Sequence, residues 1–144
     1  MSQLQEQIRA VFGQAVISAL ATVTAEGKPW VRYVVVMAQD DLTLRLATYL
    51  GSRKVAQIQA NPEVHLTAGA EGLENIGKPY VQVQALAAVS TDPELKRTMW
   101  NDMLQTYFSG PDDPNYAVVT LSPYRVEYYT FEAMEPQVWE AGRP

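Results

Sequence analysis

Short segments in which apolar and polar residues alternate, separated by turn residues, occupy most of this chain and restrict the folds open to it. Alternation with a period of two is typical of strands that bury one face, and β-branched and aromatic residues favour the extended conformation. The predicted strands are residues 16–24, 29–37, 42–48, 63–68, 80–89, 116–121 and 125–131. Because short turns join many of these segments, antiparallel pairing between neighbours is expected.

Two short helices are expected in the N-terminal half of the chain. Ser2 can cap a helix whose apolar residues recur at helical spacing up to Phe12, and Gly13 offers a stop. Ser52 can cap a second helix of about two turns. This helix is expected to end at Asn61-Pro62, because the residue before a proline disfavours the helical conformation.

The C-terminal half is expected to hold one longer helix and a turn between the last two strands. Asp92-Pro93 is a favoured helix start, and apolar residues follow along one side up to Phe108. Ser122-Pro123 is expected to form the turn, because proline interrupts the hydrogen bonding of a strand. Residues 132–144 show no clear period, so no strand is predicted there.

The length and composition of the chain fit one globular domain that spans residues 1–144. A chain of 144 residues with 47% hydrophobic and 19% charged residues can bury a sizeable core, and no repeat or linker divides it. A small barrel satisfies strands of this kind, because closure of the sheet removes exposed edges. The predicted fold class is therefore mainly β with α (α+β), a six- to seven-stranded antiparallel barrel with flanking helices.

The charge and the residue types exclude several functions. A net charge of −5 argues against a broad basic surface for nucleic acid or anionic lipid. With no cysteine, disulfides and thiolate chemistry are excluded, and the single histidine, His65, leaves little for a metal site or a catalytic triad. No metal site and no catalytic side chain are therefore assigned. Difficult chemistry would have to come from a bound organic cofactor.

The distribution of apolar residues bears on where the protein works. No apolar run reaches the length of about 18 to 20 residues that a membrane-spanning helix requires. The first residues lack the basic start and apolar core of a signal peptide. A cytoplasmic location is expected.

One short stretch can bind an anion. Thr48 ends a predicted strand, Gly51 allows a tight turn, and Ser52, Arg53 and Lys54 begin a predicted helix. A helix N-terminus presents unpaired N–H groups and partial positive charge, which together favour a phosphate. The alternative is that Ser52 only caps the helix and both cations are solvated, and spacing alone does not separate the two interpretations.

A family resemblance adds to this pattern and covers nearly the whole chain. Arg-Tyr-Val-Val-Val at 32–36, Leu-Ala-Thr-Tyr-Leu-Gly-Ser-Arg-Lys at 46–54, Gln57-Ile58 and Asn-Pro-Glu-Val at 61–64 resemble the pyridoxamine 5'-phosphate oxidase-like superfamily of FMN-binding split barrels. Val-Glu-Tyr-Tyr at 126–129 resembles its general-stress-protein branch. The resemblance implies a split barrel that forms a homodimer with FMN at the subunit interface.

The resemblance also assigns residues to the phosphate of FMN. Arg32 and Lys54 would pair with it, a bidentate guanidinium acting beside a point-charge ammonium. Thr48, Ser52 and Arg53 would add hydrogen bonds.

Further positions are assigned to the flavin ring. Tyr33, Val34 and Val35 lie on the strand that passes along the isoalloxazine ring in relatives, and Ala47 belongs to the neighbouring matched segment. Tyr129 stands where many relatives carry a tryptophan that reaches the flavin of the partner subunit. The alternative for Tyr129 is packing in the core or in the dimer interface.

The activity implied is that of a flavoprotein that passes electrons or hydride through FMN to an unidentified small molecule or partner. A pyridoxamine 5'-phosphate oxidase is disfavoured, because Met37 stands where the oxidases carry a lysine and no second phosphate site is evident. The alternative is a non-catalytic module that binds flavin or another cofactor with a stress-related role. Another is a reductase that uses the deazaflavin F420.

Overall fold

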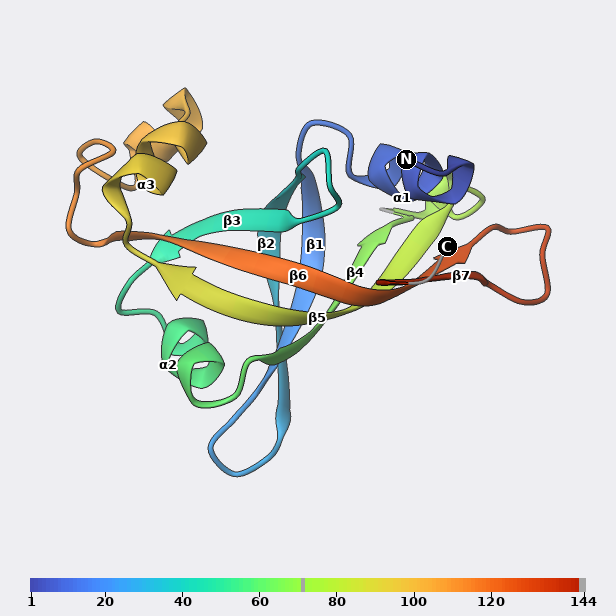
Figure 1. Cartoon of the computed structure of the whole chain (residues 1–144), viewed down its shortest axis with the longest axis horizontal. Coiled ribbons are helices and arrows are strands. Elements are labelled where there is room, and N and C mark those ends of the chain that lie inside the picture. Colours follow the sequence, from blue (N-terminus) through green and yellow to red (C-terminus); the bar gives the residue numbers. More distant parts are fainter. Residues whose placement is uncertain (71, 143–144) are drawn as a thin grey trace.

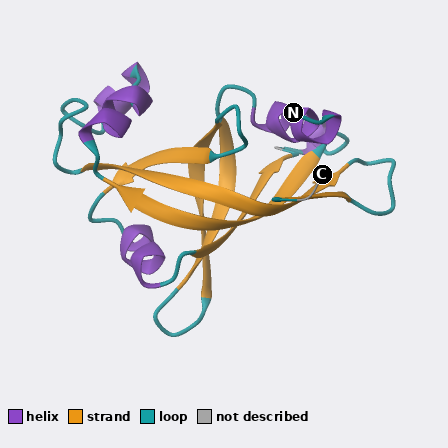
Figure 2. Ribbon diagram, in the orientation of Figure 1, coloured by secondary structure: helices purple, strands orange, loops and turns teal. Residues whose placement is uncertain are grey.

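The computed structural model describes residues 1–70 and 72–142 and contains a strongly curved antiparallel sheet (Figures 1 and 2). Its strands are β1 (Val16–Val23), β2 (Pro29–Ala38), β3 (Leu44–Tyr49), β4 (Glu63–Gly69), β5 (Tyr80–Ser90), β6 (Tyr116–Tyr129) and β7 (Gln137–Glu140). Their order is β3-β2-β1-β4-β5-β6-β7, and β3 also pairs with β6. Six strands thus close a barrel, β7 extends it, and the predicted fold class is confirmed.

The barrel is split where β2 and β3 meet. These strands share only the pairs Met37↔Arg45 and Ala38↔Leu44, whereas β1 and β2 pair along eight positions. From this short contact toward the start of β2 and the end of β3, the two strands diverge. After β3 the chain forms α2 (Arg53–Ala60), which packs on β1 and β5. The divergence leaves one end of the barrel to be covered by α2 rather than by strand pairing.

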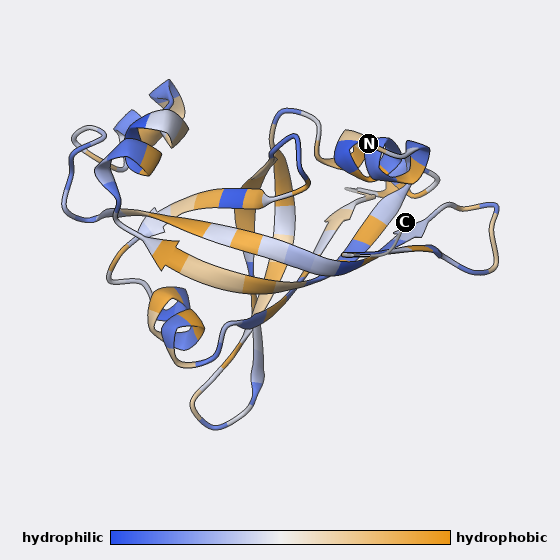
Figure 3. Ribbon diagram, viewed as in Figure 1, coloured by the Kyte–Doolittle hydropathy of each residue, from blue (hydrophilic) through white to orange (hydrophobic). Residues whose placement is uncertain are grey.

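The core follows the predicted alternation, with hydrophobic and hydrophilic residues alternating along β3 and β6 (Figure 3). Leu20, Leu46 and Leu66 point inward from three different strands and are fully buried. Helix α1 (Gln3–Phe12) adds Ile8 and Phe12 to the same cluster. Each buried side chain of this size contributes about 1.5–3 kcal/mol relative to an exposed one, so this cluster is the main source of stability.

The predicted start of α1 is confirmed. The Ser2 hydroxyl accepts a hydrogen bond from the Gln5 amide at 3.2 Å, and the Ser2 amide donates to the Gln5 side chain at 2.8 Å. This reciprocal pair is a capping box, which satisfies two N–H groups at the helix start. The chain then leaves the helix at Gly13, whose φ of 56° suits glycine.

The predicted helix over residues 92–108 is wrong in its second half. Helix α3 (Pro93–Met99) ends at Trp100, which is extended, and a short 3₁₀ turn, η2 (Asp102–Thr106), follows. The Asn101 side chain accepts a hydrogen bond from the Met103 amide at 3.0 Å and so begins a new turn in place of a continued helix.

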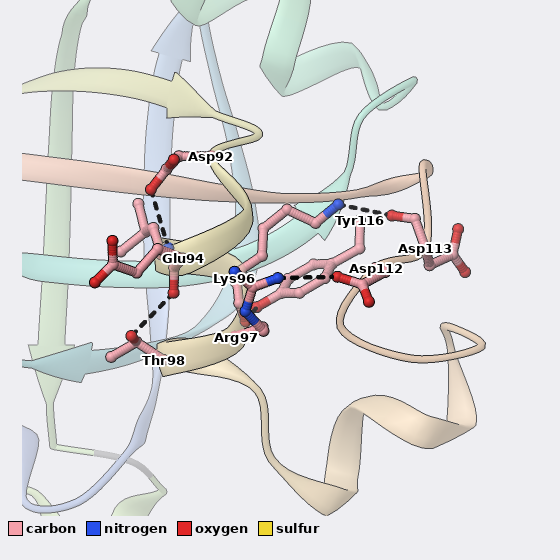
Figure 4. A network of polar contacts seen from close by, with 9 residues as sticks. Asp92, Glu94, Lys96, Arg97, Thr98, Asp112, Asp113 and Tyr116 are labelled. Atoms are coloured by element: carbon pink, nitrogen blue, oxygen red, sulfur yellow. Dashed lines mark hydrogen bonds and ion pairs between the residues drawn. The ribbon is translucent and has the colours of Figure 1, made fainter.

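A second apolar cluster lies under α3 and η2 and is built around Tyr116. The Tyr116 hydroxyl donates to the Lys96 carbonyl at 2.9 Å, and the Lys96 ammonium lies 5.3 Å from the centre of the Tyr116 ring. The same ammonium donates to the Asp113 carbonyl at 2.8 Å, as Figure 4 shows. Lys96 is therefore buried with its charge held by a carbonyl dipole and an aromatic face.

The predicted turn at Ser122-Pro123 is also wrong. β6 runs without interruption through these residues and bulges at Tyr124, since Gln84 faces Arg125 and Ala85 faces Pro123. A proline is tolerated in a strand at a bulge or an unpaired edge. Here it lies between the end of the β3 pairing and the start of the β7 pairing.

β7 is a strand that the sequence pattern did not predict, because it is only four residues long and half polar. It is held by Arg125, which donates to Glu140 at 2.8 Å and to Glu127 at 2.7 Å.

The helices of the described residues include none with the length and apolar character that a membrane span requires.

Candidate functional site

Three cations gather where the end of β3, the middle of β2 and the start of α2 meet. Lys54 is half-buried, and its ammonium donates to the Thr48 hydroxyl at 2.6 Å and approaches the Ser52 hydroxyl at 3.5 Å. The Thr48 and Ser52 hydroxyls lie 3.2 Å apart. The structure thus brings these three predicted site residues into one group.

Ser52 is the residue at the N-cap of α2, but its side chain does not cap the helix. Its hydroxyl accepts no hydrogen bond from the first turn and lies instead against Thr48 and Lys54. No acidic residue stands in that first turn. The predicted N-cap position of Ser52 is confirmed, but its side chain forms no capping hydrogen bond, so the helix N–H groups have no side-chain acceptor from Ser52.

Arg32 reaches the same end of the barrel from β2 and is held there by four acceptors. Its guanidinium donates to the Thr22 hydroxyl at 2.7 Å and to the Gln57 side-chain oxygen at 2.9 Å. It also donates to the carbonyls of Trp30 at 3.1 Å and Leu20 at 3.3 Å. These contacts fix the guanidinium between β1, β2 and α2.

Thr22 and Gln57 were not predicted as site residues. They are joined by a hydrogen bond of 2.5 Å from the Thr22 hydroxyl to the Gln57 oxygen. Two signals in the sequence could have found them. Gln57 follows Lys54 by one helical turn and so shares its face, and Thr22 is a polar residue at an inward position of a mostly apolar strand.

The cations of this cluster, Arg32, Arg53 and Lys54, form no ion pair with the carboxylates of residues 1–70 and 72–142. In the part of the chain that the structure describes, the ion pairs involve other residues. Burial, and then the charge of Arg32, lowers the pKa of Lys54, while burial and the charge of Arg53 lower the pKa of Arg32. Cations that repel one another in a partly buried place favour an anion as ligand.

The remaining predicted residues of β2 and β3 divide between the two faces of the barrel. Tyr33 and Val35 point outward and are 81% and 43% exposed. Val34 packs against the main core, and Ala47 packs against the cluster around Tyr116. Only Tyr33 and Val35 are therefore open to a ligand or a partner through their side chains.

Tyr129 is the last residue of β6, whereas Thr48 of the cluster pairs with Ala117 near the start of that strand. None of the described contacts of Tyr129 is with the cation cluster. Its ring stacks on Tyr80 with centroids 4.8 Å apart and planes 5° apart, and its hydroxyl donates to Glu127 at 2.8 Å. Within one chain, Tyr129 and the cations thus form separate features.

Comparison with known proteins places this arrangement in a family. The profile of the pyridoxamine 5'-phosphate oxidase family matches residues 4–130. The chain belongs to this family. The expected family, with its split barrel, is thereby confirmed.

Two relatives place the chain near one branch of the pyridoxamine 5'-phosphate oxidase family. It is 32% identical over 120 residues to general stress protein 26 of Bacillus subtilis (strain 168), covering 83% of this chain and 84% of that protein. The crystal structure of general stress protein 26 from Bacillus anthracis str. Sterne superposes with a TM-score of 0.81 at 27% identity, covering 96% of this chain and 99% of that one. The predicted resemblance to the general-stress-protein branch is confirmed.

The fold is shared more widely than this branch. An F420 reductase superposes with a TM-score of 0.64 at 22% identity, covering 82% of this chain and 94% of that one. At this identity the likeness concerns the fold alone, and the ligand has to be argued from the residues of the site.

Proposed function

We propose that this protein binds FMN and works as an FMN-dependent oxidoreductase. The observation that carries the proposal is the cluster of three cations, without a carboxylate partner among the described residues, at an uncapped helix start. A phosphate monoester carries about −1.5 to −2 charges at neutral pH. It therefore fits this cluster in charge and in hydrogen-bonding capacity.

The residues of the cluster have separate tasks in this proposal. Lys54 and Arg32 neutralise the phosphate, while the Thr48 and Ser52 hydroxyls and the first N–H groups of α2 donate hydrogen bonds to it. Thr22 and Gln57 do not contact the ligand but hold the guanidinium of Arg32 in place. Bound FMN would supply the electron or hydride transfer, and the chain would orient it and exclude water.

The homodimer belongs to the same proposal. Supporting it, Ile17, Val31, Tyr33 and Val35 form an apolar outer surface on β1 and β2, each between 43% and 81% exposed. Adjacent exposed apolar side chains of this kind mark interaction surfaces. A second chain against this surface would cover it and would bring its own Tyr129 toward the flavin ring, as the family resemblance implies.

We expect the purified protein to have twice the 16.0 kDa mass of one chain in sedimentation equilibrium. Tyr33→Glu should weaken the dimer by about tenfold or more, because an unpaired carboxylate would be buried in the interface. Met134→Glu, at a site that is 99% exposed on the loop before β7, is the matched control and should leave the dimer unchanged. Equal effects of both variants, or a monomeric parent protein, would contradict the proposed interface.

The redox function is tested by the visible spectrum. We expect the protein, purified or reconstituted with FMN, to show a flavin band that bleaches when NADH or NADPH is added without air. A stable flavin colour would support the binding module instead, and failure to retain FMN would contradict the proposed cofactor. Mass spectrometry of the released ligand distinguishes FMN from the deazaflavin F420.

The affinity for FMN should fall as the pH rises toward 10.5, the ordinary pKa of lysine. Burial and Arg32 lower the pKa of Lys54 in the free protein, so Lys54 begins to lose its proton below that value, and phosphate binding must restore it. Between the lowered pKa of Lys54 and 10.5, the unfolded chain binds more protons than the folded chain. The free energy of unfolding of the protein without ligand therefore rises with pH in that range. Titration of FMN binding against pH checks this. Lys54→Arg should move the fall to higher pH, and identical profiles would exclude Lys54 as its cause.

A further inference from the structure

A cavity of about 470 Å³ lies at the end of the barrel that α1 covers, away from the end that α2 covers (Figure 1). Gln7 and Val11, four residues apart on one face of α1, form one side of it. Val16 from the start of β1 and Pro79 from the segment before β5 add apolar surface. Its volume lies within the range of about 300–1,000 Å³ that is usual for small-ligand pockets.

This cavity is separate from the cation cluster. Val16 lines the cavity at the first position of β1, whereas Thr22, six residues later in the same strand, bonds to Arg32. Six residues of an extended strand span about 20 Å. A ligand in the cavity therefore does not compete with a phosphate at Arg32 and Lys54.

Tyr128 directs an unpartnered hydroxyl into the cavity. Its side chain points inward from β6, packs against the main core and is only 6% exposed. The hydroxyl makes no hydrogen bond to another described residue. Nor is it sealed in the core, because the buried polar side-chain atom without a partner in the described part of the chain is Nε of Arg45. Since buried polar groups normally have a partner, the Tyr128 hydroxyl is free to bond to a ligand in the cavity that it lines.

Two further side chains give the cavity its charge and its donors. Lys78, exposed on the segment between β4 and β5, forms no ion pair with a described carboxylate. The side-chain amide of Gln7 makes no hydrogen bond to a described residue. No described Asp or Glu lines the cavity. An ammonium, an amide and a hydroxyl can all donate hydrogen bonds, so the group that they suit is a carboxylate, which accepts them.

The wall of the cavity at the end of β4 is held in an uncommon backbone conformation. Ala70 has a φ of 51° and Gly69 a φ of 101°, both in the region that favours glycine. A Cβ atom at Gly69 would lie 2.6 Å from the Pro79 carbonyl oxygen, so only glycine allows this approach. Such a conformation persists where tertiary contacts maintain it. The wall therefore has a fixed shape before any ligand binds.

We propose that this cavity binds a small aromatic monocarboxylate, at a site independent of the flavin. Lys78, Gln7 and Tyr128 bind the carboxylate, and the ring lies against the apolar surface of Val16 and Pro79. One ammonium balances a single negative charge, whereas a phosphate monoester would bring about −1.5 to −2. The cavity thus differs in its preferred anion from the cluster of three cations.

Calorimetric titration of the full chain with phenylacetate, without added FMN, tests this assignment. We expect a dissociation constant of about 1 mM or tighter, an ordinary affinity for a ligand of about ten non-hydrogen atoms. Phenylacetamide and phenethylamine carry the same ring without the negative charge. Each should bind at least about tenfold more weakly, because it lacks the charged hydrogen bonds.

Tyr128→Phe separates a role in binding from a role in folding. It removes only the hydroxyl, so phenylacetate should bind about two- to tenfold more weakly. The urea midpoint of unfolding should not fall, because that hydroxyl has no described partner in the protein. Tyr116→Phe is the matched control. It breaks the hydrogen bond to the Lys96 carbonyl, so it should lower the midpoint and leave phenylacetate binding unchanged.

The charge is tested by a second pair of variants. Lys78→Met should weaken phenylacetate binding by about five- to tenfold, whereas Lys28→Met, at an exposed position of the β1–β2 turn, should not change it. Equal effects of these two variants, or equal affinities for phenylacetate and phenylacetamide, would overturn the proposal. So would a lack of phenylacetate binding, or a fall in stability in Tyr128→Phe as large as in Tyr116→Phe.

A repeat of the titration with saturating FMN separates this site from the flavin site. Equal affinity for phenylacetate with and without FMN supports an independent cavity. Loss of phenylacetate binding when FMN is present would place the carboxylate at the flavin site and overturn the assignment. Failure of FMN to bind leaves the result for phenylacetate as the test of the cavity alone.

Discussion

Lys54→Ala should weaken FMN binding by about 10- to 150-fold, which corresponds to the 1.5–3 kcal/mol that a hydrogen bond to a charged group contributes. The Lys54 ammonium is already directed at the Thr48 hydroxyl and has no carboxylate partner among the described residues. Its removal therefore takes positive charge from the ligand without exposing an acid. Fluorescence titration with FMN measures the change.

Two controls make this result specific. Lys28→Ala removes the same charge from an exposed position in the β1–β2 turn and should change the affinity little, because exposed charges are screened. Arg32→Ala should weaken binding by a similar amount to Lys54→Ala. Because Arg32 also bonds to Thr22 and Gln57, the free energy of unfolding of the Arg32→Ala protein has to be measured as well. Unchanged affinity in both Arg32→Ala and Lys54→Ala would contradict the phosphate assignment.

Tyr116→Ala should lower the free energy of unfolding by about 3–5 kcal/mol, the usual range for removing a buried aromatic side chain. Tyr116 is fully buried, and its ring lies 5.1 Å from Phe108 and 5.7 Å from Trp100. Its loss also strips the aromatic face from the buried Lys96 ammonium. Urea-induced unfolding followed by circular dichroism gives the value.

Tyr116→Phe and Tyr107→Ala are the matched controls for this change. Tyr116→Phe keeps the ring and loses only the hydrogen bond to the Lys96 carbonyl, so it should cost about 1 kcal/mol. Tyr107 is 61% exposed, and Tyr107→Ala should stay within about 0.5 kcal/mol. A similar loss in Tyr107→Ala and Tyr116→Ala would show that the second cluster does not depend on the Tyr116 ring.

The strands were predictable where apolar and polar residues alternate in short segments. The wrong predictions lie where tertiary contacts override the local sequence signals. Pro123 normally ends a strand, but the partner strands change there and a bulge absorbs the missing donor. Trp100 continues a helical pattern, yet Asn101 offers the backbone a competing hydrogen bond. β7 depends on Arg125 from another strand, a contact that its own four residues do not encode.

The candidate site was predictable in part for the same reason. Thr48 to Lys54 are close in the sequence, so helix-start chemistry marks them as a candidate anion site, although it does not separate that role from a simple helix cap. Arg32 needed the family resemblance, since its place depends on the pairing of β1 with β2. Gln57 and Thr22 bond to Arg32, and their own segments mark them only as polar residues on the Lys54 face and at an inward strand position, without showing that Arg32 is the partner.

The side chain of Ser52 leaves the first turn of α2 without the acceptor that a serine in this position normally provides. The Val55 amide donates to the Ser52 carbonyl at 3.1 Å, and Ser52 offers no side-chain acceptor to the other N–H groups of the turn. If an anion binds there as proposed, it would supply the missing acceptor and stabilise the folded helix by mass action. On that proposal, a saturating anion would lengthen the survival of this segment in limited proteolysis.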